Sequence, residues 1–348
     1  MSETIDIQEQ EILRFLDIPI KPFHDRSTRW LFEDKEYVRD LVDMLASELV
    51  ARIDFSRLSP INSGFVSDTL REQVADMVFS VPFQTELGTD DLLIYILVEH
   101  QSSDDPIMGY RMLSYMMQIW DAQRKSWETD KVPKSRWRFQ PILPIVYYTG
   151  EKPWKSTLAF DAIMDIPDML ARFVPKFDKL FLSVNETETA SLKEVNHPLG
   201  WLLTVLQKQN ADIDTLSNTL FEVGSYLESL DETKAPQRRK AFIYLVLLIL
   251  NQRPDAEHKE LLTLLDKHAH DMEVENMAKS ILDRKYEQGE ERGETRARRE
   301  DIIRLLHIRF DNVPETVTQK VNRTRSLSRL NSLFEKAATI DSLDDFDE

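Results

Sequence analysis

Apolar side chains run without a break from Leu92 to Val98 and are followed at once by Glu99, His100 and Gln101. A short apolar run, partly β-branched and bounded by polar residues, is typical of a buried central strand. Successive side chains on a strand point to opposite faces, so Glu99 and Gln101 share one face and His100 points the other way. Polar groups at the end of a buried strand must be hydrogen-bonded or must bind a ligand.

The residues before this strand predict two further elements. Apolar positions recur at three- and four-residue steps from Trp30 to Val50, which indicates an amphipathic helix. A second apolar run ends at Pro82 and contains Asp76, and the segment 84–91 fits a hairpin connection. We therefore expect Asp76 and Glu99 to lie on neighbouring antiparallel strands.

The residues after the strand complete an α/β domain. The pattern from Met108 to Trp127 is helical, and a short strand is predicted from Lys179 to Val184. Between them, the apolar run after Pro141 contains a second proline, Pro144, which favours an edge strand or one that begins at Ile145. Together these elements predict a mixed central sheet flanked by helices.

From residue 197 onward the pattern is helical. Helices are expected at 198–208, 214–230, 237–252, 257–268, 304–310 and 327–338. The very charged stretch at 273–300 predicts a solvated helix or a linker. The resulting division is a leader (1–22), an α/β domain (23–190), a helical region (191–272), a charged helix or linker (273–300) and a small helical region with an acidic tail (301–348).

Composition and charge narrow the function classes. The chain has 348 residues, no cysteine and a net charge of −17, so disulfides and thiolate metal sites are excluded and a cytoplasmic protein is expected. The longest apolar run, Ala241 to Leu250, is about half of the roughly 20 residues that a membrane span needs, so we expect a buried helix and no membrane contact. The long charged helix favours homo-oligomerisation through the helical C-terminal region.

Two carboxylates on adjacent strands form a candidate metal site. Mg²⁺ prefers oxygen ligands and usually takes one or two carboxylates, and Ca²⁺ or Mn²⁺ are alternatives. Asp76, Glu99 and the backbone carbonyl of His100 are the candidate ligands, and Gln101 could orient a water molecule. Salt bridges or caps at the strand ends are the simpler explanation of the same carboxylates.

A basic stretch is the candidate DNA-binding surface. From 111 to 155 there are nine Lys or Arg against four Asp or Glu, a net charge of +5. Such residues could track a phosphate backbone, and Trp127 and Trp137 could stack on bases, although an ordinary solvated loop explains them equally well. Arg111 could contact phosphate or pair with Asp76 or Glu99. The candidates are Arg111, Arg124, Lys125, Lys131, Lys134, Arg136 and Arg138.

An ordered series of motifs resembles the Rpn family of recombination-promoting nucleases, also called YhgA-like putative transposases. The series comprises Val98-Glu99-His100-Gln101-Ser102, Tyr110-Arg111-Met112-Leu113-Ser114-Tyr115 and Pro144 to Trp154, with His24-Asp25 and Ala75 to Phe79 upstream. The resemblance covers residues 23–160 well and the rest loosely.

The resemblance implies a PD-(D/E)XK nuclease core and DNA as the substrate. Asp76 then corresponds to the acid of the first core motif, and Glu99 with Gln101 to the second, with Gln101 where many such enzymes carry lysine. Asp25 is a further catalytic candidate, although Arg26 to Arg29 depart from the family pattern. We therefore expect a Mg²⁺-dependent DNA endonuclease that acts in recombination or transposition-like events. The alternative is a weak or inactive nuclease fold that binds DNA or protein.

Overall fold

The computed structural model describes residues 23–61, 77–85, 92–194, 197–269, 274–310, 313–324, 326–340 and 342–346, excepting the side chains of 92, 274–275, 280–292 and 344–345. Two compact units succeed each other along the chain, and the boundary falls between Glu275 and Asn276. The predicted leader and Asp76 lie outside the described residues.

The first unit is built on a five-stranded mixed sheet. The strands follow the chain order, β1 (Ser59–Pro60), β2 (Met77–Phe83), β3 (Leu92–Gln101), β4 (Ile142–Tyr148) and β5 (Leu180–Ser183). β1, β2 and β3 pair antiparallel, whereas β3, β4 and β5 pair parallel. The predicted α/β class with a mixed central sheet is confirmed, and so are the strand at 92–101 and its antiparallel partner.

β4 differs from the prediction because it is an internal strand that already starts at Ile142. In a parallel ladder, successive residues bond alternately to the two neighbouring strands. The bonds from Tyr95 N to Pro141 O and from Thr149 N to Gln101 O, both 2.9 Å, show that the odd-numbered residues face β3. Pro144 therefore faces the β5 side, where pairing begins only at Ile145. The missing N–H of Pro144 costs no ladder bond, and the edge-strand prediction was wrong.

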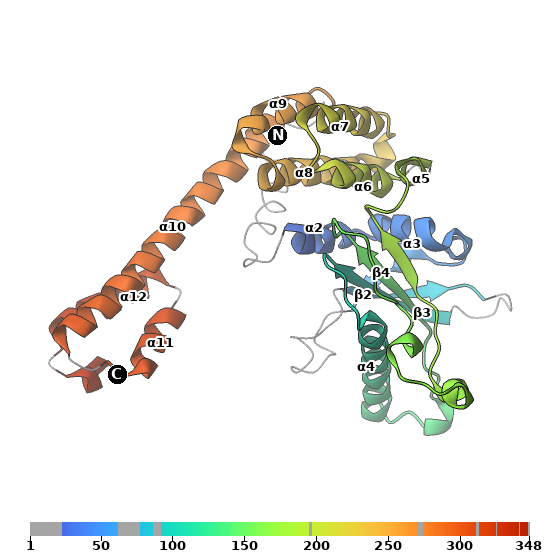
Figure 1. Cartoon of the computed structure of the whole chain (residues 1–348), viewed down its shortest axis with the longest axis horizontal. Helices are drawn as coiled ribbons and strands as arrows, with labels where there is room; N and C mark the ends of the chain where they lie inside the picture. Colours follow the sequence, from blue (N-terminus) through green and yellow to red (C-terminus); the bar gives the residue numbers. More distant parts are fainter. Residues whose placement is uncertain are drawn as a thin grey trace. The chain divides into compact units, whose positions relative to one another are not determined.

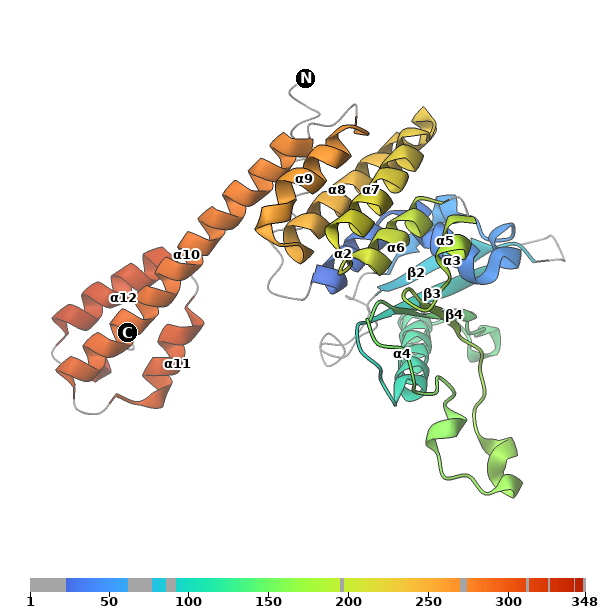
Figure 2. The same cartoon turned by 45° about the horizontal axis from the view of Figure 1, so that its top comes forward.

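Helices cover both faces of the sheet (Figures 1 and 2). α2 (Phe23–Phe32) and α3 (Lys35–Val50) lie on one face, and α4 (Met108–Thr129) lies on the other. The ring of Phe32 meets Tyr147 of β4 edge-on at 5.7 Å between centroids. Side chains of α4 form a buried cluster with the opposite face, which comprises Leu97, Met108, Met112, Tyr115, Met116 and Val146. Because successive side chains of a strand point to opposite faces, β3 and β4 have a separate hydrophobic core on each side.

The predicted helices after residue 197 are present in the first unit. They are α6 (Pro198–Lys208), α7 (Ile213–Glu228), α8 (Ala235–Gln252) and α9 (Asp255–Asp266), preceded by α5 (Thr189–Glu194). α8 packs on α2, where the rings of Phe23 and Tyr244 lie 6.0 Å apart, and its residues 241–250 are all buried. The buried helix expected at Ala241–Leu250 is confirmed. Across the described residues, every helix is too short or too polar to span a membrane.

The second unit has a hydrophobic core of its own. α10 (Val274–Arg309) enters it, and α11 (Glu315–Arg323), α12 (Leu327–Thr339) and a 3-10 turn (Leu343–Phe346) follow. The buried side chains are Ile302, Leu306, Val317, Val321, Leu330, Ala337 and Phe346.

Three details of this unit differ from the sequence prediction. The separate helix expected at 304–310 is the end of α10, which runs on through its charged stretch as one helix. The sequence did not predict α11. Within the acidic tail, Phe346 is only 1% exposed, because its ring fills the core between the helices.

A charged junction fixes α3 against the start of α6. His197 contacts Asp40 through Nδ1 at 2.8 Å and Asp43 through Nε2 at 2.7 Å. Asp40 also accepts a hydrogen bond from the backbone N–H of Leu199 at 3.4 Å. The hydrogen bond to Asp40 raises the pKa of His197 above its usual value, against the opposing effect of burial.

This junction predicts a pH-dependent part of the stability. A raised pKa in the folded state means that the stabilisation is complete below the unfolded pKa of about 6.5 and is lost as the pH rises through the folded value. His197→Gln should cost about 2 kcal/mol at pH 5.5 and clearly less at pH 8.5, as measured by urea unfolding. A cost that is equal at both pH values would contradict a charged His197.

Candidate functional site

The end of β3 presents its polar side chains to the two faces as predicted. Gln101 donates a hydrogen bond from Nε2 to Oε1 of Glu99 at 2.9 Å, so both lie on the α4 side. His100 contacts Asp25 of α2 on the other side. The alternation expected from the sequence is confirmed, and the strand separates two polar clusters.

Arg111 of α4 is the centre of the cluster on the α4 side. Its guanidinium forms an ion pair with Glu99 and another with Asp105, where Nη1 and Oδ2 are 2.7 Å apart. It also donates to the hydroxyl of Tyr115, from Nε at 3.2 Å and from Nη2 at 3.0 Å. Gln101 Oε1 lies 3.5 Å from Nη1. Four oxygen-bearing side chains therefore surround one cation.

The position of Arg111 follows from the local sequence. Asp105 ends the loop after β3, and its Oδ1 accepts a hydrogen bond from Ile107 N at 2.9 Å just before α4 begins. Arg111 and Tyr115 are four residues apart and therefore share one face of the helix. Sequence analysis missed Asp105 and Tyr115 as members of this cluster, although the i, i+4 spacing and the Asp-Pro turn were available as signals.

Burial makes the Glu99–Arg111 pair costly to break. The side chain of Glu99 is only 2% exposed, whereas that of Arg111 is 30% exposed. Desolvation opposes the charged form of Arg111, but the hydrogen bond to Asp105 and the charge of Glu99 outweigh it and raise the arginine pKa. A buried carboxylate without a partner is costly, so Glu99 requires a cation at this position. Of the two options considered for Arg111, the structure shows the ion pair.

His100 links β3 to α2 and β4 on the opposite face. Its Nδ1 lies 2.7 Å from Asp25 Oδ1 and its Nε2 lies 2.7 Å from Thr149 Oγ1. Desolvation, with a smaller contribution from nearby His100, lowers the pKa of His24 below its usual value. The structure thus brings Asp25 to His100 and not to Glu99.

The basic stretch divides into two parts. Arg124 is paired with Asp121 and Glu128, and Lys125 with Asp121, all along α4. The side chains of Lys131, Lys134, Arg136 and Arg138 form no ion pair with a carboxylate among the described residues. Only this second part carries a local excess of positive charge.

The tryptophans of this stretch pack on each other. The rings of Trp127 and Trp137 lie 5.5 Å apart, and Trp127 also contacts Phe139 at 5.1 Å. The indole N–H of Trp137 donates to the carbonyl of Val132 at 3.0 Å. These contacts join the end of α4 and the loop after it in an aromatic cluster. Within the same loop, Arg138 donates to the carbonyls of Ser135 and Trp137.

Within the described part of the chain, no three His, Asp or Glu side chains come together in a group that could hold a metal ion. The predicted second ligand, Asp76, lies outside this part. It directly precedes Met77, the first residue of β2, and Met77 pairs with Val98, the neighbour of Glu99.

Comparisons with known proteins identify the family of the chain. The family model described as "Putative transposase, YhgA-like" matches residues 22–238. The chain is 25% identical over 195 residues to recombination-promoting nuclease RpnC of Escherichia coli K12, which covers 56% of this chain and 60% of that protein. It is 28% identical over 189 residues to recombination-promoting nuclease RpnD of Escherichia coli O157:H7, which covers 53% of this chain and 66% of that protein.

A third relative differs in its name. The inactive recombination-promoting nuclease-like protein RpnE of Escherichia coli K12 is 26% identical over 198 residues, 56% of this chain and 60% of that protein. The match thus spans about three fifths of the length of these curated relatives. No solved structure matches the chain. Because the family model covers well over half of the 348 residues, the chain belongs to the family of YhgA-like putative transposases.

Proposed function

We propose that this protein is a metal-dependent endonuclease that hydrolyses phosphodiester bonds of DNA. The observation that carries the proposal is the buried Glu99 carboxylate at the end of the central strand, which accepts a hydrogen bond from Gln101 and forms an ion pair with Arg111. Relatives named recombination-promoting nucleases support this choice of reaction.

The buried carboxylate of Glu99 suits a divalent cation. It already carries a positive group, the guanidinium of Arg111, and hard cations such as Mg²⁺ prefer oxygen ligands. In the proposal, Asp76, Glu99 and the backbone carbonyl of His100 hold the ion. Bound there, Mg²⁺ would polarise the scissile phosphodiester and lower the pKa of a water molecule.

Gln101 and Arg111 have distinct roles in this proposal. Gln101 is anchored on Glu99 through Nε2, and its Oε1, which lies 3.5 Å from Nη1 of Arg111, would orient the attacking water. With a metal held by Glu99, Arg111 would keep its contacts with Asp105 and Tyr115. The donors that now bind Glu99 would then bind a phosphate, since arginine offers paired donors to phosphate oxygens. Arg111 would supply the positive charge that a lysine at position 101 would otherwise give.

DNA contacts are assigned to the loop after α4. Lys131, Lys134, Arg136 and Arg138 have no carboxylate partner among the described residues, so their charge is available to phosphates. Arg124 and Lys125 are neutralised on their own helix and contribute less.

A second candidate function is a binding or regulatory protein on an inactive nuclease fold. The observation that favours it is Arg111 itself, because its guanidinium already satisfies the charge of Glu99. A relative named as inactive is consistent with this alternative.

Removal of either carboxylate should abolish cleavage. Asp76→Ala and Glu99→Gln should each lower Mg²⁺-dependent nicking of plasmid DNA by on the order of 100-fold or more, because a catalytic metal contributes several kcal/mol to the transition state. Glu128→Gln is the matched control, since this exposed carboxylate of α4 pairs only with Arg124. Wild-type cleavage by a folded Asp76→Ala or Glu99→Gln protein would refute the metal assignment.

Metal binding should stabilise the protein measurably. At 100 times its dissociation constant, an ion that binds only the folded state adds about 2.7 kcal/mol, which should raise Tm by several degrees. Ca²⁺ should raise the Tm of the wild type and leave Glu99→Gln unchanged in differential scanning calorimetry. The absence of both a Tm shift and cleavage at millimolar metal would contradict the metal site and favour the regulatory alternative.

Arg111 should compete with the metal for Glu99. Arg111→Ala should destabilise the metal-free protein by about 3–5 kcal/mol, because it leaves a buried carboxylate without its cation. Millimolar Ca²⁺ should restore much of this loss, so the rise in Tm should be larger in Arg111→Ala than in the wild type. Arg124→Ala, an exposed paired arginine of the same helix, should cost less than about 1 kcal/mol and show no such gain. An equal rise in all three proteins would contradict the competition.

A further inference from the structure

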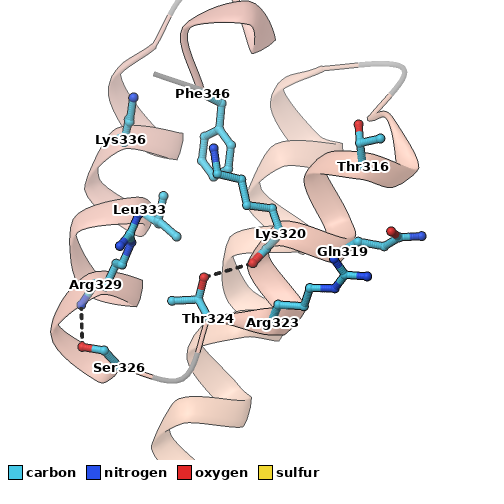
Figure 3. Close-up of a pocket in the computed structure, with 10 residues that line it drawn as sticks. All are labelled: Thr316, Gln319, Lys320, Arg323, Thr324, Ser326, Arg329, Leu333, Lys336 and Phe346. Atoms are coloured by element: carbon cyan, nitrogen blue, oxygen red, sulfur yellow. Dashed lines mark hydrogen bonds between the residues drawn. The ribbon is translucent and has the colours of Figure 1, made fainter. Parts of the chain in front are cut away.

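The second unit contains a basic pocket that lies between α11 and α12 (Figure 3). Its volume is about 650 Å³. Four cationic side chains line it, two from each helix, namely Lys320, Arg323, Arg329 and Lys336. A pocket of this size can hold a group as large as a nucleotide.

Positive charge is concentrated at this pocket. From 313 to 340 there are five Lys or Arg against two Asp or Glu, a net charge of +3 in a chain with a net charge of −17. The side chains of Arg323, Arg329 and Lys336 form no ion pair with a carboxylate among the described residues. Arg124 of the first unit, by contrast, has two carboxylate partners on its own helix. The pocket therefore attracts anions more strongly than the paired basic residues do.

The walls of the pocket are fixed by the core beneath it. Leu333 and Phe346 form its apolar side, and Phe346 is buried in the hydrophobic core of the unit. Arg299 of α10 donates to the carbonyl of Thr324 at the end of α11, from Nε at 3.0 Å and from Nη2 at 2.7 Å. This contact joins the end of α11 to α10. Figure 3 shows Lys320 and Arg329 on the helices that border the pocket, together with Leu333 and Phe346.

We propose that this pocket binds backbone phosphates of DNA. Lysine and arginine donors are the groups that contact phosphate oxygens most often, and the hydroxyls of Thr316 and Ser326 add neutral donors. Arg323 and Arg329 are exposed and come from different helices, which suits successive phosphates of a strand better than one enclosed anion. The proposal does not depend on nuclease activity, because it concerns a different unit of the chain.

DNA binding by the full-length protein tests the proposal in EDTA, where a metal-dependent nuclease cannot cleave. Fluorescence anisotropy with a labelled duplex should give a Kd that is about tenfold or more higher for the double variant Arg323→Gln/Arg329→Gln. Each phosphate contact contributes about 0.9 to the slope of log K against log salt, so the slope should become shallower by about 1.8. Lys336→Gln is an independent variant and should act in the same direction with about half the change in slope.

The matched control is Arg296→Gln/Arg304→Gln, which removes the same charge from exposed positions of α10 outside the pocket. We expect this control to retain wild-type affinity for DNA. Both pocket variants should lose affinity at unchanged Tm. An equal loss in the control and the pocket variants would overturn the proposal, and so would unchanged binding in the pocket variants. If 10 mM inorganic phosphate raises the Tm of the wild type but the pocket variants bind DNA normally, the pocket takes a small phosphate and the proposal is wrong.

Discussion

A carboxylate buried at the end of the central strand constrains the first unit. Glu99 is almost fully removed from water, and an uncompensated charge in such a place would cost several kcal/mol. Arg111 of α4 compensates this charge through an ion pair, which connects the start of α4 to the end of β3. On the other face, His100 ties the same strand to α2 through Asp25 and to β4 through Thr149. The two residues thus anchor both helical layers to one short stretch of chain.

Most of the fold could be predicted because apolar residues recur along its helices and strands with the spacing typical of each. The run from Leu92 to Val98, the helix after Met108 and the helices expected between residues 198 and 268 all have the observed positions within a few residues. The error at β4 came from treating Pro144 as disruptive, whereas its direction in the ladder makes it harmless. α11 was missed because it is a short helix with few apolar residues, and its stability comes from Val317 and Val321 in a core that only the tertiary structure assembles.

The candidate site was only partly accessible from the sequence. The period of a strand separates Glu99 and Gln101 from His100, and this local geometry is confirmed. The partners that decide the electrostatics come from elsewhere in the chain, and spacing alone could not choose between a phosphate and a carboxylate as the partner of Arg111. Asp105 and Tyr115 acquire a role only because Arg111 lies between them and Glu99. Packing of Trp127 against Trp137 likewise requires a loop conformation that no sequence pattern specified.

The central claim is that Glu99 exchanges the guanidinium of Arg111 for a divalent metal ion. A crystal structure of the protein grown with Mn²⁺ tests it most directly, because anomalous scattering locates this ion independently of any assumed ligand. We expect an anomalous peak about 2 Å from a carboxylate oxygen of Glu99, with Arg111 turned away from Glu99 and still in contact with Asp105. A peak remote from Glu99, or an intact Glu99–Arg111 pair at saturating Mn²⁺, would contradict the account.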